Sequence, residues 1–101
     1  MPKTALIAKL PTQPGKRGDL VTAFQPMLDH VNSEAGTEVY ILHLDDGDEN
    51  VAWVYELYTD SDAMGAHGGS EAMQALFGAL GDLLGGAPEL ITVTPVGGKG
   101  L

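Results

Sequence analysis

Hydrophobic residues along the chain follow two spacings, and each spacing predicts a different kind of element. Four short apolar runs have the length and the β-branched and aromatic content that are typical of strands. They span residues 4–10, 37–44, 51–58 and 89–96. Two longer segments place apolar residues three and four positions apart, as amphipathic helices do. These segments cover residues 16–33 and 61–84.

Glycine-rich breaks and a capping residue set the boundaries between these elements. Gly-Gly at 68–69 divides the second helical segment into a short helix over 61–67 and a longer one, for which Ser70 is a suitable N-cap. The loop over 45–50 contains an Asp-Gly pair, which is a hairpin signal. We expect residues 97–101 to form a loose C-terminal tail.

The order of the predicted elements is strand, helix, strand, strand, helix, strand. This order predicts a ferredoxin-like α+β fold, in which an antiparallel sheet carries both helices on one face. The chain has 101 residues, a length that suits one hydrophobic core, so we expect a single domain over residues 1–101.

The two central predicted strands are apolar on both faces. In residues 51–58 one face carries Val51, Trp53, Tyr55 and Leu57, and the other carries Ala52, Val54, Glu56 and Tyr58. Strands with two apolar faces are buried on both faces, and helices on one side cover only one of them. We therefore predict a symmetric homodimer, in which the sheet face opposite the helices packs against the same face of a second copy.

The amino-acid composition makes nucleic acids and membranes unsuitable partners. The 14 acidic and 5 basic residues give a formal net charge of −9, and the basic residues form no broad positive face of the kind that nucleic acids require. No segment approaches the roughly 20 apolar residues that span a bilayer, and the N-terminus does not resemble a signal peptide. We expect a cytoplasmic protein without nucleic-acid or membrane partners. Cysteine is absent, which excludes disulfides and thiolate sites.

Glu56 and His67 are the candidate catalytic residues. Glu56 lies in an otherwise apolar strand, where a carboxylate is costly unless a partner pairs with it. His67 shares one helical face with Ala63 and Met64, so its side chain is expected to point inward toward Glu56. A carboxylate beside an imidazole can handle protons near neutral pH. Such a pair can equally be a structural link between helix and sheet, and the residues alone leave both interpretations open.

Aromatic residues outline the pocket expected around this pair. Tyr58 shares the strand face of Glu56, and Tyr40 comes from the neighbouring strand, so both are candidate substrate-binding residues. Trp53 and Tyr55 lie on the opposite face, where we expect them to fill the dimer interface.

The other histidines do not extend the site. His30 falls off the apolar stripe of the first helical segment, and we expect it to be solvated. His43 lies on the strand face opposite Tyr40, where an interface role is expected. Three histidines so dispersed lack the spacing of metal ligands, and no metal site is expected.

Several short motifs, in a fixed order, resemble those of a known family. They are Pro14-Gly15-Lys16-Arg17, Glu34-Ala35-Gly36, Tyr55-Glu56-Leu57-Tyr58 followed by Ser61 to His67, and Pro88-Glu89-Leu90. Their order and spacing resemble the antibiotic biosynthesis monooxygenase family, including its quinol monooxygenases, over about Thr4 to Val96. The resemblance implies a dimeric α+β barrel with a pocket between sheet and helices in each subunit.

The resemblance also implies a chemistry. Characterised relatives oxidise phenolic or quinol-like substrates with molecular oxygen and use no flavin, haem or metal cofactor. The implied function is a cofactor-independent monooxygenase of a small phenolic or quinol substrate, with His67 and Glu56 as proton-handling residues. The chain departs from the best-studied members, which use asparagine, tryptophan and arginine in the pocket, because its arginine, Arg17, starts the first helix. The alternative is a non-catalytic small-molecule-binding or structural dimeric barrel in which Glu56–His67 is a structural pair.

Overall fold

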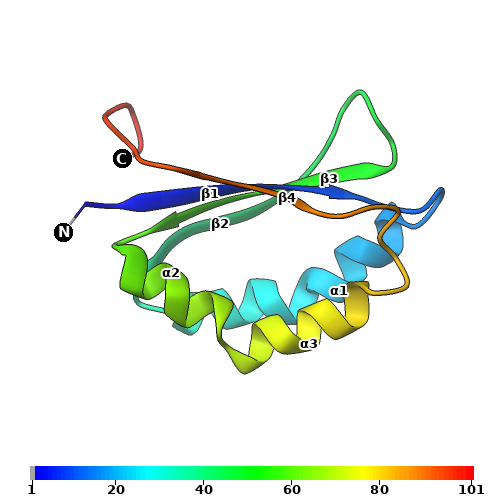
Figure 1. Cartoon of the computed structure of the whole chain (residues 1–101), viewed down its shortest axis with the longest axis horizontal. Coiled ribbons are helices and arrows are strands. Elements are labelled where there is room, and N and C mark those ends of the chain that lie inside the picture. The colour runs from blue at the N-terminus through cyan, green and yellow to red at the C-terminus, as the bar shows by residue number, and fades with distance from the viewer. Residues whose placement is uncertain (1) are drawn as a thin grey trace.

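A four-stranded antiparallel sheet carries the helices on one face in this computed structural model, which describes residues 2–101 (Figure 1). In chain order the elements are β1 (Thr4–Pro11), α1 (Arg17–His30), the 3-10 helix η1 (Val31–Ser33), β2 (Thr37–Leu44), β3 (Val51–Tyr58), α2 (Ser61–Gly68), α3 (Glu71–Leu80) and β4 (Glu89–Val93). The strands lie side by side in the order β2-β3-β1-β4. This arrangement is the ferredoxin-like α+β fold expected from the order of elements.

Side-chain caps begin both helices of the second helical region. Asp60 accepts a hydrogen bond from the backbone N–H of Ala63 at 2.8 Å, and Ser70 accepts one from Met73 at 3.2 Å. Helices of 8 and 10 residues are marginal by themselves, and each cap stabilises its helix by about 1 kcal/mol. The caps therefore help to fix the last turn of α2, which carries His67.

Two elements end earlier than the hydrophobic pattern indicates. The apolar stripe of α3 continues to Leu84, but the helix ends at Leu80 and Leu84 instead pairs with Thr12 as an isolated bridge. The last strand covers only Glu89–Val93. Pro95, just beyond it, has no N–H with which to continue the pairing.

Strand register decides which side chains face the helices. Val54 lies in the core together with Phe24 of α1, so its face of β3 is the helix-covered face. By alternation Glu56 and Tyr58 share this face, and Tyr40 of β2 lies directly opposite Glu56. The strand faces predicted from the alternation of residues are confirmed.

The hydrophobic core fills the space between the sheet, α1 and α3. Its buried members are Ala8, Leu10, Leu20, Phe24, Met27, Val31, Ala52, Val54, Leu76 and Leu80. Burial of each large side chain stabilises the fold by about 1.5–3 kcal/mol. Helix α2 contributes none of these residues, and the space between α2 and the sheet holds the polar side chains of the candidate site instead.

The outer face of the sheet carries exposed apolar side chains. Ile41, Ile91 and Val93 point to this face and are 49%, 53% and 38% exposed. Residues 97–101 contain no helix or strand and lie against the same face, where they line part of a pocket of about 310 Å³ with Tyr55. Within residues 2–101, no helix has the length and hydropathy needed to cross a bilayer.

Candidate functional site

His67 fills the space between the last turn of α2 and the sheet. Its side chain is only 3% exposed. The centroid of its ring lies 5.1 Å from that of Tyr40 and 5.6 Å from that of Tyr58, with tilted ring planes. Packing against two aromatic rings restricts the imidazole to a narrow range of orientations.

Glu34, in the segment between η1 and β2, is the carboxylate that binds His67. Nδ1 of His67 lies 2.8 Å from Oε1 of Glu34, which also accepts a hydrogen bond from the hydroxyl of Thr37 at 2.9 Å. The other oxygen, Oε2, lies 3.1 Å from Nε2 of His30. Burial alone would raise the pKa of Glu34, but the hydrogen bonds from His67 and Thr37 and the charges of the histidines outweigh burial and hold this pKa below its usual value. Glu34 is therefore ionised near neutral pH.

The second ring nitrogen of His67 has no protein partner. Because Nδ1 donates to the Glu34 carboxylate, a neutral imidazole carries its lone pair on Nε2. Nε2 is buried, and no atom of residues 2–101 forms a hydrogen bond with it. Buried polar atoms are paired in the great majority of cases, and an exception calls for an explanation. Nε2 is placed to accept a hydrogen bond, or a proton, from a bound molecule.

Gly36 allows α2 to lie close to the segment that carries Glu34. A Cβ atom at this position would lie 2.5 Å from the Cβ of Ala63 in α2, which is closer than real Cβ atoms approach. The carbonyl of Gly36 also accepts a hydrogen bond from the N–H of Thr59, just before α2, at 2.9 Å. The absence of a side chain at Gly36 thus determines how near His67 comes to Glu34.

Glu56 forms a separate hydrogen bond on the sheet side of His67. Its Oε1 accepts from the hydroxyl of Tyr58, two residues farther along β3. Burial raises the pKa of Glu56 and outweighs the opposite effects of the Tyr58 hydrogen bond and of His67. Burial and the neighbouring carboxylates also raise the pKa of Tyr40 and of Tyr58, so both hydroxyls stay protonated.

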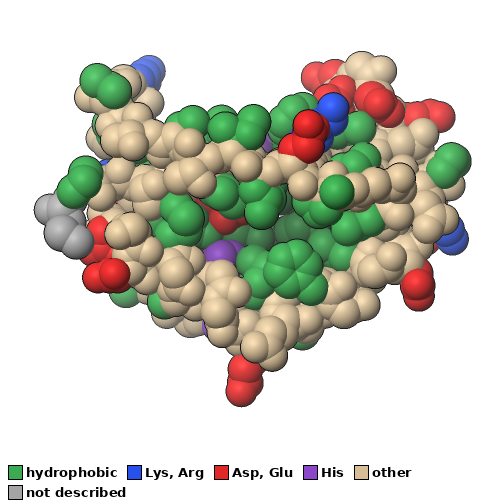
Figure 2. Space-filling model, viewed as in Figure 1, with side chains coloured by type: hydrophobic (Ala, Val, Ile, Leu, Met, Phe, Trp, Pro, Cys, Tyr) green, Lys and Arg blue, Asp and Glu red, His purple; other side chains and the backbone are tan. Residues whose placement is uncertain are grey.

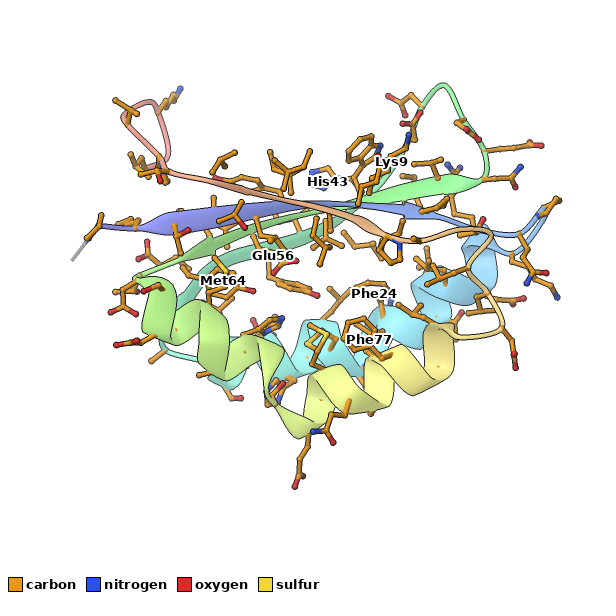
Figure 3. All side chains as sticks on the ribbon, viewed as in Figure 1. Lys9, Phe24, His43, Glu56, Met64 and Phe77 are labelled. Atoms are coloured by element: carbon orange, nitrogen blue, oxygen red, sulfur yellow. The ribbon has the colours of Figure 1, made fainter. Side chains whose placement is uncertain are left out.

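A hollow between the sheet and the helices leads to these groups. Figure 2 shows this hollow lined by hydrophobic side chains, with a histidine and an acidic side chain visible inside it. Glu56 projects from the sheet toward the helices, and Met64, Phe24 and Phe77 project from the helices toward the sheet (Figure 3). Phe77 of α3 is 56% exposed and Leu90, on the helix-facing side of β4, is 60% exposed. These exposed apolar side chains suit a ligand with an apolar ring.

Comparisons with known proteins identify the family. The sequence profile described as antibiotic biosynthesis monooxygenase matches residues 4–79, which is most of the chain. The chain belongs to the antibiotic biosynthesis monooxygenase family. No curated protein matches the sequence significantly.

Solved structures share the fold over nearly the whole chain. A candidate antibiotic biosynthesis monooxygenase from Caulobacter crescentus CB15 is 31% identical, with a TM-score of 0.90 over 95% of this chain and 92% of that one. Rv0793 from Mycobacterium tuberculosis is 22% identical, with a TM-score of 0.87 over 96% and 98%. PA3566 from Pseudomonas aeruginosa is also 22% identical, with a TM-score of 0.86 over 96% and 97%. The last two comparisons show likeness of fold alone.

This member of the antibiotic biosynthesis monooxygenase family keeps its arginine and its tryptophan away from the hollow. Nη1 of Arg17 donates to the carbonyl oxygens of Asp45, Asp48 and Val51 at 2.9, 3.0 and 3.1 Å, and so holds the β2–β3 hairpin. Nε1 of Trp53 donates to Oδ2 of Asp45 at 2.7 Å. Both side chains therefore stabilise the hairpin and are not part of the candidate site.

The structure gathers the four site residues predicted from the sequence and corrects the pairing among them. His67, Tyr40 and Tyr58 are in ring contact, and Tyr58 is hydrogen-bonded to Glu56. Glu56 and His67, which the sequence predicted as a pair, are not hydrogen-bonded to each other, because Nδ1 binds Glu34 and Nε2 binds no atom of residues 2–101. The acid that binds His67 is Glu34, and not Glu56 of the apolar strand β3.

Glu34 and His30 were missed as site residues, and the expectation that His30 is simply solvated is also corrected. Their spacing of four residues was a signal that the two side chains meet. A further signal was the placement of an acid just beyond a helix C-terminus, which the helix dipole disfavours. Among the described residues, no group of three His, Cys, Asp or Glu side chains is arranged to hold a metal ion.

Proposed function

We propose that the protein is a cofactor-independent monooxygenase that oxidises a small phenolic or quinol substrate with molecular oxygen. The observation that supports this proposal is the buried Nε2 of His67, which has no hydrogen-bond partner among residues 2–101. The hydrogen bond from Nδ1 to Glu34 keeps the hydrogen of the neutral ring on Nδ1, so the lone pair is on Nε2. A phenolic hydroxyl is a hydrogen-bond donor with an acidic proton, so it complements this atom. Family membership supports the same reaction class.

The first step of the proposed reaction is removal of the phenolic proton. Nε2 takes the proton, and the electron pair of the broken O–H bond stays on the substrate oxygen. The phenolate passes one electron to O₂, and the resulting phenoxyl radical and superoxide combine at a ring carbon. The peroxide takes the proton back from the imidazolium, the ring carbon loses its proton, and the O–O bond breaks with release of water. One oxygen atom enters the quinone product, and the substrate supplies all four electrons.

The remaining side chains have distinct roles in this scheme. Glu34 fixes the imidazole tautomer and offsets the positive charge that forms on His67. The protonated hydroxyls of Tyr40 and Tyr58 bind the substrate oxygen. Glu56 holds the Tyr58 hydroxyl in place, and its raised pKa lets it exchange a proton more readily than an exposed carboxylate does.

The proposed substrate is uncharged before it reacts. Glu34 is ionised beside the base, and Arg17 is committed to the hairpin. Three lysines are paired elsewhere, in the ion pairs Lys3–Glu38, Lys9–Glu89 and Lys16–Asp19. A substrate with a carboxylate or phosphate group would be repelled by Glu34, so a neutral aromatic ring is the expected ligand.

We also infer a homodimer that forms through the sheet face opposite the helices. Its support is the exposure of Ile41 at one edge of that face and of Ile91 and Val93 at the other, since exposed apolar side chains across one face are typical of interfaces. Sedimentation of the full chain tests this inference. A stable monomer at micromolar concentration would contradict it.

Oxygen uptake by the purified, chelator-treated protein tests the proposed activity. Hydroquinone and 1-naphthol serve as substrates, and with ¹⁸O₂ we expect one labelled oxygen in the quinone and the other in water. The methyl ether of 1-naphthol is the matched control, because it has the same ring without an ionisable hydroxyl. It is expected to bind without turnover. His67→Ala and Glu56→Gln are both expected to slow the reaction of the phenol.

Turnover of both variants at the rate of the parent would reject the roles assigned to His67 and Glu56. Binding of the phenol without oxygen uptake would support the alternative function, a non-catalytic small-molecule-binding or structural dimeric barrel. In that case the polar cluster links α2 to the sheet, and a lower melting temperature is the main consequence of His67→Ala.

A further inference from the structure

One carboxylate joins the buried histidine of the site to a second histidine near the surface. Glu34 contacts Nδ1 of His67 through Oε1 at 2.8 Å and Nε2 of His30 through Oε2 at 3.1 Å. The exposed fraction of the side chain rises along this series, from 3% for His67 to 17% for Glu34 and 37% for His30. The three side chains form a continuous hydrogen-bonded series from the site toward solvent.

We propose that His67, Glu34 and His30 are a proton path that brings the buried imidazole into equilibrium with solvent. Once a proton has entered on Nε2 of His67, the ionised carboxylate of Glu34 accepts the Nδ1 proton of the imidazolium on one oxygen, and the ring is left neutral with its hydrogen on Nε2. A half-turn of the carboxyl group exchanges its two oxygens, and the proton then passes to Nε2 of His30 in the tautomer that carries its hydrogen on Nδ1. His30 releases a proton to water from its other nitrogen, so the number of protons is conserved at each step. The same steps in reverse return a proton to His67.

The use of this path in catalysis rests on the proposed function. In the proposed reaction the phenolic proton enters on the buried Nε2, and the Nδ1 proton leaves through Glu34 while the hollow is occupied. When the peroxide takes the hydrogen from Nε2, Nδ1 regains a proton along the same path, and the starting tautomer is restored. His30 acts only through Glu34 and does not touch the substrate.

Proton exchange between Nδ1 of His67 and water, measured by NMR on ¹⁵N-histidine-labelled protein without substrate, tests the path. In His30→Gln the amide can still donate to Glu34 but cannot pass a proton on. Exchange is expected to slow about tenfold or more, and free imidazole in solution is expected to restore part of the rate. Thr37→Val is the matched control, since it also removes a hydrogen bond to Glu34 but lies off the path. It is expected not to slow exchange, because loss of this hydrogen bond raises the pKa of Glu34 and favours transfer of the proton to it.

Unchanged exchange in His30→Gln would overturn the path, because Glu34 would then exchange directly with water. Equal slowing in both variants would also overturn it, since the bonds would only orient Glu34. His30→Asn provides a second variant with the same expected slowing. Slow exchange in His30→Gln together with no oxygen uptake supports the path and removes the monooxygenase proposal. Oxygen uptake that requires His67, together with unchanged exchange, removes the path and leaves the monooxygenase proposal in place.

Discussion

Glu34 and Glu56 lie on two sides of His67, and their surroundings affect them in opposite ways. Glu34 is hydrogen-bonded to side chains of α1, β2 and α2, and these bonds hold its pKa below its usual value despite burial. Glu56 accepts from Tyr58 within the same strand, and burial raises its pKa. The carboxylate with partners from several elements therefore orients the imidazole, whereas the carboxylate bonded within one strand keeps a pKa that burial sets.

Removal of the orienting carboxylate is expected to have the largest effect. In Glu34→Ala, Nδ1 of His67 loses its acceptor, and the imidazole can place its proton on Nε2 instead. Phenol turnover is then expected to fall about 10²–10⁴-fold, as when a general base loses its tautomer or is removed. The ¹⁵N chemical shifts of His67 report the tautomer without substrate. Glu56→Gln is the matched control and is expected to keep the proton on Nδ1; a changed tautomer in the control alone would reverse the two roles.

The close approach at Gly36 offers a second way to separate the two sides of the site. Gly36→Ala places a Cβ against Ala63, so α2 has to shift, and we expect a loss of about 1–3 kcal/mol in the free energy of unfolding. The shift lengthens the contact between Glu34 and His67, which NMR of the His67 ring reports. Gly65→Ala in α2 meets nothing within 4 Å and is expected to preserve or increase stability. Equal stability of the two variants would show that packing at Gly36 does not hold α2.

The opposite pKa shifts predict opposite dependences of stability on pH. Because the native pKa of Glu34 is lowered from 4.5, its contribution is present above pH 4.5 and is lost as pH falls through the native pKa. Because the native pKa of Glu56 is raised from 4.5, its contribution is present below pH 4.5 and is lost as pH rises through the native pKa. At a pH above the native pKa of Glu56, we expect urea unfolding to show that Glu56→Gln is about 1 kcal/mol more stable than the parent. This difference is expected to shrink as the pH falls toward 4.5. A difference that grows toward acid pH would contradict the raised pKa.

The Glu56 side of the site could be predicted from the sequence, whereas the contact between Glu34 and His67 could not. Residues two apart in a strand share a face, so alternation alone places Glu56 beside Tyr58. Glu34 meets His67 across 33 residues of chain because Gly36 lets α2 approach β2. That approach is a property of tertiary packing, which local periodicity does not record.

The C-terminal end of α3 also could not be predicted from local hydrophobic spacing. The apolar stripe extends to Leu84, although the helix ends at Leu80. The spacing of apolar residues indicates which side chains are removed from water, and a residue outside a helix can also be buried. Leu84 lies in a turn after α3, where it pairs with Thr12 and is half-buried. Hydrophobic spacing therefore predicted the order of elements and their faces, but not where α3 ends.

The smallest expected effect concerns the hydrogen bond between Tyr58 and Glu56. Tyr58→Phe removes the donor that lowers the pKa of Glu56, so this pKa is expected to rise further above its usual range. The cost in stability is about 0.5–1.5 kcal/mol, the usual contribution of one hydrogen bond. A ¹³C NMR titration of the Glu56 carboxyl measures the shift. Tyr40→Phe is the matched control, because the Tyr40 ring also packs on His67 but its hydroxyl does not bond Glu56. An equal pKa shift in both variants would mean that burial, and not the Tyr58 hydroxyl, governs the protonation of Glu56.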